Sequence, residues 1–125
     1  MQNYAFGADI GGTSVKLGLF YADGELLEKW EITTRTGEEF DILQDVADSC
    51  RGMMEQKKLG TEEFAGIGIG VPGPVHDGGE VRSCVNLGWE NVRAAEVLTG
   101  YLSGFPGWTP ENIHVRCAND ANAAA

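Results

Sequence analysis

Residues 8–20, ADIGGTSVKLGLF, join two stretches in which apolar residues alternate as in a β-strand. A corner of two glycines and a threonine lies between Ile10 and Val15, after a first strand that carries Asp9 near its end. A tight hairpin needs no acid at this position. The corner is therefore either a plain hairpin, in which Asp9 has no role, or a ligand-binding site to which the carboxylate of Asp9 contributes.

The residue types at this corner favour a metal-bound phosphate. Gly11 and Gly12 lack a Cβ, so a phosphate can approach successive backbone N–H groups, and Thr13 adds a hydroxyl donor. The carboxylate of Asp9 would repel a phosphate unless Mg²⁺ lay between them, and proteins commonly hold Mg²⁺ by one or two carboxylates, with water completing its shell. The pattern alone leaves the plain hairpin open.

Composition narrows the class of protein. The chain has 125 residues, which suits one domain with a buried core. Its 19 acidic and 9 basic residues give a net charge of -10, which argues against a non-specific nucleic-acid binder because such binding depends on Lys and Arg. The sequence has neither a secretory signal pattern nor a run of about 18 apolar residues. We therefore expect a cytoplasmic protein without a nucleic-acid or membrane partner.

Cysteine and histidine give no metal or disulfide signal. Cys50, Cys84 and Cys117 are far apart and form no C-x-x-C pair, so neither a disulfide framework nor a zinc ribbon is predicted. His76 and His114 are isolated, whereas metal sites need several converging ligands. We expect no metal ligand set made of these residues.

Alternation elsewhere predicts an α/β layer fold with a mixed sheet. Strands are expected over residues 4–10, 15–20, 25–32, 64–71 and 113–117. The first three form an antiparallel meander, in which a type I′ turn at Asp23-Gly24 leads into a strand with Leu26, Trp30 and Ile32 on one face. In FAGIGIGV at 64–71 glycines alternate with apolar residues, so we expect something to pack closely against the glycine face.

Apolar residues at helical spacing predict helices that cover the sheet. A T-x-x-E capping box at Thr36 and Glu39 precedes apolar residues that recur from Leu43 to Met54, and Gly60 ends this pattern. A second helix is expected around residues 92–101. The sequence after residue 117 opens a third.

Two further motifs depend on their structural context. Gly68, Gly70 and Gly73 satisfy G-x-G-x-x-G, but a turn follows where a dinucleotide site needs a helix, so that interpretation is rejected. Asn119 and Asp120 lie just past a strand and at a helix start, where α/β proteins hold ligand-binding side chains. An ordinary helix N-cap is the alternative for this pair.

Four motifs together resemble the N-terminal half of a ROK-family sugar kinase. They are DIGGT at 9–13, GIGVPGPV at 68–75, VNLGW at 85–89 and NDANAAA at 119–125, in the family's order. The resemblance spans essentially the whole chain. It implies that residues 1–125 form an actin-like, ribonuclease H-like lobe, with a hexose and MgATP in the cleft between it and a second lobe. It also implies a homo-oligomer and a kinase that phosphorylates the 6-hydroxyl of glucose or a related hexose.

The resemblance assigns roles to the sugar-facing residues. Asp120 resembles the general base that takes the proton of the sugar's 6-hydroxyl. Asn119 and Asn86 resemble hydrogen-bonding partners of other hydroxyls, although Asn86 taken alone is typical of a turn. The turn at Gly73 borders the same pocket.

The same resemblance assigns the phosphate-facing residues. Gly11, Gly12 and Thr13 would face the transferred phosphate. Asp9 would orient Mg²⁺ through water, and Lys16 is a further candidate for phosphate contact. These roles suit phosphoryl transfer, in which positioning and charge neutralisation dominate.

The family's adenosine pocket, zinc cluster and second sugar-binding stretch belong to the other lobe and have no match here. We therefore expect this chain alone to be inactive. The alternatives are a kinase for N-acetylmannosamine, fructose or allose, a non-catalytic sugar-binding module, and the sugar-binding lobe of a ROK transcriptional regulator. A regulator carries a helix-turn-helix domain ahead of this lobe, for which a first strand at residue 4 leaves no room.

Overall fold

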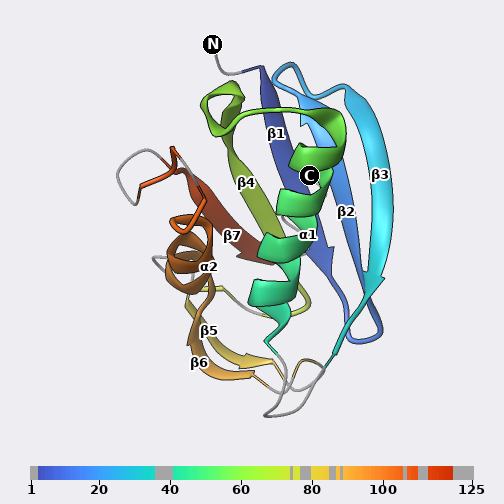
Figure 1. Ribbon diagram of the computed structural model, residues 1–125. Helices are drawn as coiled ribbons and strands as arrows, with labels where there is room; N and C mark the ends of the chain where they lie inside the picture. Colours follow the sequence, from blue (N-terminus) through green and yellow to red (C-terminus); the bar gives the residue numbers. More distant parts are fainter. Residues whose placement is uncertain are drawn as a thin grey trace.

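The computed structural model describes residues 3–35, 41–73, 75–76, 80–84, 87, 89–105, 107–109 and 113–119 (Figure 1). Its elements are β1 (Tyr4–Ile10), β2 (Ser14–Tyr21), β3 (Leu26–Thr33), α1 (Ile42–Lys57), the short 3₁₀ helix η1 (Thr61–Glu63), β4 (Phe64–Val71), β5 (Glu80–Cys84), β6 (Trp89–Arg93), α2 (Ala94–Leu102) and β7 (Val115–Asn119). Five strands form one sheet in the order β3-β2-β1-β4-β7, and β5 pairs with β6 in a separate small sheet.

The five-stranded sheet is mixed. β2 is antiparallel to β1 and β3, whereas β4 runs parallel to β1 and β7 runs parallel to β4. Figure 1 shows α1 and α2 on the same face of the sheet, with α2 on the β7 side. The α/β lobe with an N-terminal antiparallel meander is thus confirmed, and its two described helices share one layer.

The core lies between the sheet and this helical layer. The buried residues of α1 recur at helical spacing: Ile42, Leu43, Val46, Ala47, Cys50, Met53 and Met54. They face strand residues that alternate along β1 and β2: Phe6, Ala8, Ile10, Val15, Leu17 and Leu19. Burying one such large side chain contributes about 1.5–3 kcal/mol. The indole Nε1 of Trp30 donates to Ser49 Oγ at 2.8 Å, which also fixes α1 against β3.

Aromatic rings extend the core to the first residues of β4. Phe6 and Phe64 stack with ring centroids 4.6 Å apart, and Trp108 meets Phe64 edge to face. The buried Nε1 of Trp108 donates to the carbonyl of Thr61 at 3.1 Å. This pairing satisfies the indole and holds the segment after α2 against the beginning of β4.

The ends of α1 use other residues than the sequence suggests. Asp41 caps the first turn, because its Oδ1 accepts from the backbone N–H groups of Leu43 at 3.0 Å and Gln44 at 3.3 Å. The predicted capping box at Thr36 and Glu39 lies outside the described residues. At the other end Lys58, with φ 58°, adopts the left-handed conformation that stops the helix.

The turn between β2 and β3 differs from the predicted type I′ turn. Gly24 has φ 96° and Asp23 does not have a positive φ, so three residues form the loop with glycine in its left-handed position. A bulge follows, in which Leu26 pairs with Phe20 and Glu28 with Leu19. The extra residue turns Leu26 to the opposite face from Trp30 and Ile32, so their predicted common face is wrong.

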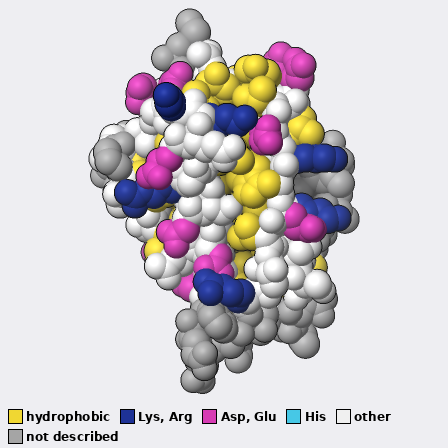
Figure 2. Space-filling model, turned by 45° about the vertical axis from the view of Figure 1, so that its right-hand side comes forward, with side chains coloured by type: hydrophobic (Ala, Val, Ile, Leu, Met, Phe, Trp, Pro, Cys, Tyr) yellow, Lys and Arg dark blue, Asp and Glu magenta, His cyan; other side chains and the backbone are white. Residues whose placement is uncertain are grey.

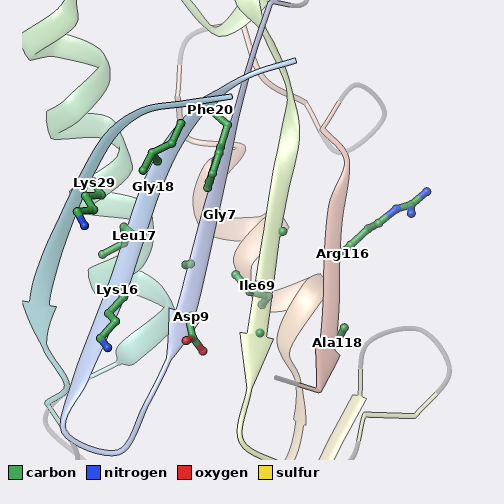
Figure 3. A pocket seen from close by; sticks show the side chains of 14 residues that line it. Gly7, Asp9, Lys16, Leu17, Gly18, Phe20, Lys29, Ile69, Arg116 and Ala118 are labelled. Atoms are coloured by element: carbon green, nitrogen blue, oxygen red, sulfur yellow. The ribbon is translucent and has the colours of Figure 1, made fainter. Parts of the chain in front are cut away.

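The face of the sheet opposite the helices carries a row of glycines. Gly18, Gly7 and Gly68 are neighbours across β2, β1 and β4, and the row ends in Lys29 on β3 and Arg116 on β7. The row lies in a groove of about 770 Å³ (Figure 3). We call this hollow the glycine groove.

The close packing expected against the glycines of β4 occurs at Gly66, where a Cβ would collide with the backbone carbonyl of His114, and does not occur at Gly68. On the neighbouring strands β2 and β1, the ring of Phe20 leaves no room for a Cβ on Gly18, which would lie 2.7 Å from it, and little room for one on Gly7, at 3.1 Å. A Cβ on Gly68 would meet nothing within 4 Å. Part of the glycine face is therefore covered by a ring of the same sheet, and part is open.

Two details of the second half depart from the expected pattern. The hairpin of β5 and β6 was not expected, and β6 runs directly into α2 at Ala94. The last strand spans Val115–Asn119 rather than residues 113–117. The backbone carbonyl of His114 still accepts from Ile67 N at 2.9 Å, so pairing with β4 begins just before this strand.

Figure 2 shows the β3 side of the molecule, where hydrophobic side chains form a strip between charged ones. Exposed hydrophobic residues in and beside β3 are Tyr21, Leu26 and Leu27. β3 is the edge of the sheet, and an edge strand leaves one row of backbone hydrogen-bonding groups free to pair.

Candidate functional site

Three of the sequence motifs, which begin at residues 9, 68 and 119, reach the same edge of the sheet. β1, β4 and β7 are parallel, so their carboxyl ends meet at this edge, where Asp9 is level with Gly70 and Val71 is level with Asn119. Gly73 follows two residues after β4 and is buried. Ligands of open α/β sheets bind outside the carboxyl ends of such strands. The fold therefore places the corner after β1, the turn after β4 and the end of β7 together.

In the corner between β1 and β2, the carbonyls of Gly11 and Thr13 both accept hydrogen bonds from Thr34. Gly11 N donates to Ser14 O at 2.9 Å and closes the turn. Thr34, just after β3, donates from Oγ1 to Gly11 O at 2.6 Å and from its backbone N to Thr13 O at 2.9 Å. The corner is thus braced by the neighbouring strand.

The amide donors of this corner face solvent. Gly12 and Thr13 are exposed, and their N–H groups find no acceptor among the residues that the structure describes. Two adjacent unpaired amides and a threonine hydroxyl suit a phosphate oxygen. The expected anion-binding character of the corner fits this geometry.

Asp9 and Lys16 lie opposite each other on β1 and β2, with exposed side chains on the groove face (Figure 3). Within the described part of the chain the two make no ion pair with each other, and the carboxylate of Asp9 meets no other cation. Glu31, across from Lys16, accepts instead from Ser14 Oγ at 2.8 Å. The carboxylate beside the corner therefore remains available for a cation such as Mg²⁺.

The sugar-facing predictions fall largely outside the described residues. Asp120 and Asn86 are among the residues not described, and of Asn119 only the backbone, as the last residue of β7, is placed. Their proposed contacts with a sugar remain predictions.

The thiols of Cys50 and Cys117 are poor nucleophiles. Burial raises the pKa of the Cys50 thiol to about 12 and that of Cys117 to about 11, so both stay protonated at neutral pH. In the described ranges no three His, Cys, Asp or Glu side chains gather as metal ligands. Neither of the two described α-helices is long and apolar enough to cross a bilayer.

Thr34 is the residue of this site that the sequence did not reveal. Its two hydrogen bonds reach from the residue just after β3 to a corner more than twenty positions earlier in the chain. A threonine at the end of a strand carries no local signal of such a contact. Only the register of β3 on β2 shows it.

Comparison with known proteins identifies the family. The ROK family model matches residues 5–125. A glucokinase of Halalkalibacterium halodurans is 29% identical over 95% of this chain and 34% of its own length. An N-acetyl-D-glucosamine kinase of Yersinia enterocolitica is 34% identical over 96% of this chain and 36% of its own length. The chain thus spans about a third of the length of these curated relatives.

A solved structure gives the fold. The ROK glucokinase of Streptomyces griseus, in complex with glucose and AMPPNP, superposes with a TM-score of 0.71 at 26% identity, over 97% of this chain and 34% of that one. Together with the sheet order β3-β2-β1-β4-β7, this confirms the actin-like lobe expected from the four motifs. The chain belongs to the ROK family.

Proposed function

We propose that this chain is the N-terminal lobe of an ATP-dependent sugar kinase that phosphorylates the 6-hydroxyl of glucose or a related hexose. The observation that carries the proposal is the corner after β1, where the exposed amides of Gly12 and Thr13 lie beside the carboxylate of Asp9, which has no ion-pair partner among the described residues. The H. halodurans and S. griseus relatives, both glucokinases, support glucose as the first sugar to test.

In this proposal each group has one task. The N–H groups of Gly12 and Thr13 bind oxygens of the transferred phosphate, and Lys16, which pairs with Asp9 across β1 and β2, adds positive charge. Asp9 holds the water shell of Mg²⁺, which neutralises phosphate charge when it is bound. Asp120 accepts the hydroxyl proton, while Asn119, Asn86 and the Gly73 turn orient the sugar.

The remainder of the active site is proposed to lie in a second lobe. The relatives are about three times as long as the matched chain. The adenosine pocket, the structural zinc and further sugar contacts belong to that lobe in the family pattern. A cytoplasmic homo-oligomer remains part of the same proposal.

A hexosamine is the second candidate substrate. The Y. enterocolitica relative, an N-acetyl-D-glucosamine kinase, is 34% identical to this chain, above the 29% of the H. halodurans glucokinase. Specificity depends on hydrogen bonds that reject a sugar lacking the matching group.

The test is a phosphorylation screen of the protein at its natural length. Purified protein is incubated with MgATP and glucose, mannose, fructose, allose, N-acetylglucosamine or N-acetylmannosamine, and ADP release is measured. Phosphorylation of glucose or N-acetylglucosamine at the 6-position supports the proposal. Sugar binding by calorimetry without phosphorylation of any of them would overturn it in favour of a sugar-binding or regulatory lobe.

A further inference from the structure

Thr34 controls the direction of one amide in the corner. A trans peptide unit points its C=O and its N–H in opposite directions, and the described residues contain no cis peptide bond. Gly11 O and Gly12 N–H belong to one such unit. Because Thr34 Oγ1 holds Gly11 O at 2.6 Å on the β3 side, the N–H of Gly12 is turned away from β3 and into solvent.

A second contact fixes the other side of the corner. The backbone N of Thr34 donates to Thr13 O at 2.9 Å. Thr34 therefore fastens both peptide units that flank Gly12 and Thr13. The side chain alone decides the first of these contacts, because the second uses the backbone and survives any substitution except proline.

The segment that carries Thr34 is itself anchored at both ends. β3 precedes it, paired with β2 from Ser14 to Phe20. Arg35 follows it and forms a two-point ion pair with Asp45 of α1, with Nη2 to Oδ1 at 2.6 Å and Nε to Oδ2 at 3.0 Å. The hydroxyl of Thr34 is thus presented from a fixed position between the sheet and α1.

We propose that Thr34 is a positioning residue for the nucleotide: its hydroxyl aims the N–H of Gly12 at the phosphate. This inference rests on the proposed function. It predicts a specific loss of nucleotide affinity when the hydroxyl is removed, because an unheld peptide unit must be ordered again each time the phosphate binds.

Three variants of the natural-length protein separate positioning from general structure. Thr34→Val keeps the shape but loses the hydroxyl, and Thr34→Ser restores it. Thr33→Val makes the same change at the exposed neighbouring threonine, for which no side-chain hydrogen bond is found within the described residues. Thr34→Ala replaces the valine variant where valine does not fold.

We expect removal of the Thr34 hydroxyl to change the KM for MgATP but not the KM for the sugar. Thr34→Val raises the KM for MgATP about fivefold, the loss expected for one hydrogen bond, while the KM for the sugar stays within about twofold. Thr34→Ser and Thr33→Val keep wild-type values. An unchanged KM for MgATP in an active Thr34→Val enzyme overturns the inference and leaves the proposed function intact.

A measurement without turnover keeps the two proposals distinguishable. MgATP is titrated into ¹⁵N-labelled protein and the Gly12 amide resonance is followed. A shift that saturates at about fivefold higher MgATP in Thr34→Val supports the inference even in a protein that phosphorylates no sugar. A wild-type Gly12 resonance that does not respond to MgATP overturns it.

Discussion

The phenol of Tyr101 in α2 donates a hydrogen bond to the carboxylate of Asp41, which at the same time caps the first turn of α1. The side chain of Asp41 thus caps the N-terminus of α1 and links this helix to α2. Asp41 stands at the same end of the sheet as the corner after β1, so this contact helps hold α1 behind the candidate site (Figure 1).

Tyr101→Phe should lower the free energy of unfolding by about 1 kcal/mol, the contribution of one partly exposed hydrogen bond to a charged acceptor. The bond to Asp41 raises the pKa of Tyr101 above its usual value of 10.0. A raised pKa means that the contribution is complete below about pH 10 and is lost as the pH rises through the higher folded-state value. Urea unfolding at pH 7 and between pH 9 and 11 measures both effects.

Tyr21→Phe is the control, because Tyr21 is 38% exposed and makes no hydroxyl hydrogen bond to a described residue. Equal stability losses in the two variants at pH 7 would argue against the Tyr101–Asp41 contact.

Two glycines on the same face of β4 should respond in opposite ways to alanine. A Cβ on Gly66 would collide with the backbone carbonyl of His114, so Gly66→Ala must push β7 away from β4. We expect a loss of about 1–3 kcal/mol. Gly68→Ala meets nothing within 4 Å and should be neutral or stabilise by about 0.5 kcal/mol, since alanine restricts the unfolded chain. Thermal unfolding of the pair checks this, and a Gly68→Ala loss as large as that of Gly66→Ala would contradict it.

The parts of the fold that the sequence predicted are those with strong local periodicity. Phe6, Ala8 and Ile10 alternate without interruption, and the helical spacing from Leu43 to Met54 extends over several turns of α1. Because β1 and β4 both end in motifs, their parallel pairing also brought the predicted residues Asp9 and Gly73 to one edge.

The features that the sequence missed depend on contacts between distant residues or on unusual backbone. The positive φ of Asn91 interrupts the pattern of β6, and the bulge before Glu28 reverses the face of Leu26. The ring of Phe20 fills the space over Gly18, a contact that no local pattern in β2 indicates. Thr34 belongs to the same class, because its contact forms only when β3 pairs with β2.

Gly12→Val tests whether the corner after β1 binds phosphate. Gly12 is exposed and does not need a positive φ, so a branched side chain should leave the melting temperature nearly unchanged. The same side chain would occupy the space that the proposed phosphate needs, so we expect the KM for MgATP to rise at least about tenfold with little change in sugar affinity.

Ala22→Val at the exposed loop on the opposite end of β2 is the matched control and should retain wild-type kinetics. If Gly12→Val lowers stability but leaves the nucleotide kinetics unaltered, the corner is only a hairpin.

Asp120→Asn tests the proposed general base directly. Asp120 follows Asn119, the last residue of β7, and β7 ends at the sheet edge shared with Asp9 and Gly73. Asparagine keeps the shape and the helix-capping ability of aspartate but does not accept the hydroxyl proton. In the natural-length protein we expect kcat to fall by about two to four orders of magnitude, with sugar affinity largely kept, as for a group that acts in the transition state.

Asp48→Asn is the control. It changes an exposed carboxylate of α1 that has no ion-pair partner among the described residues, and it should leave kcat unchanged. Steady-state kinetics and glucose-binding calorimetry on both variants decide between the roles: a near-normal kcat in Asp120→Asn would assign Asp120 to the helix cap alone.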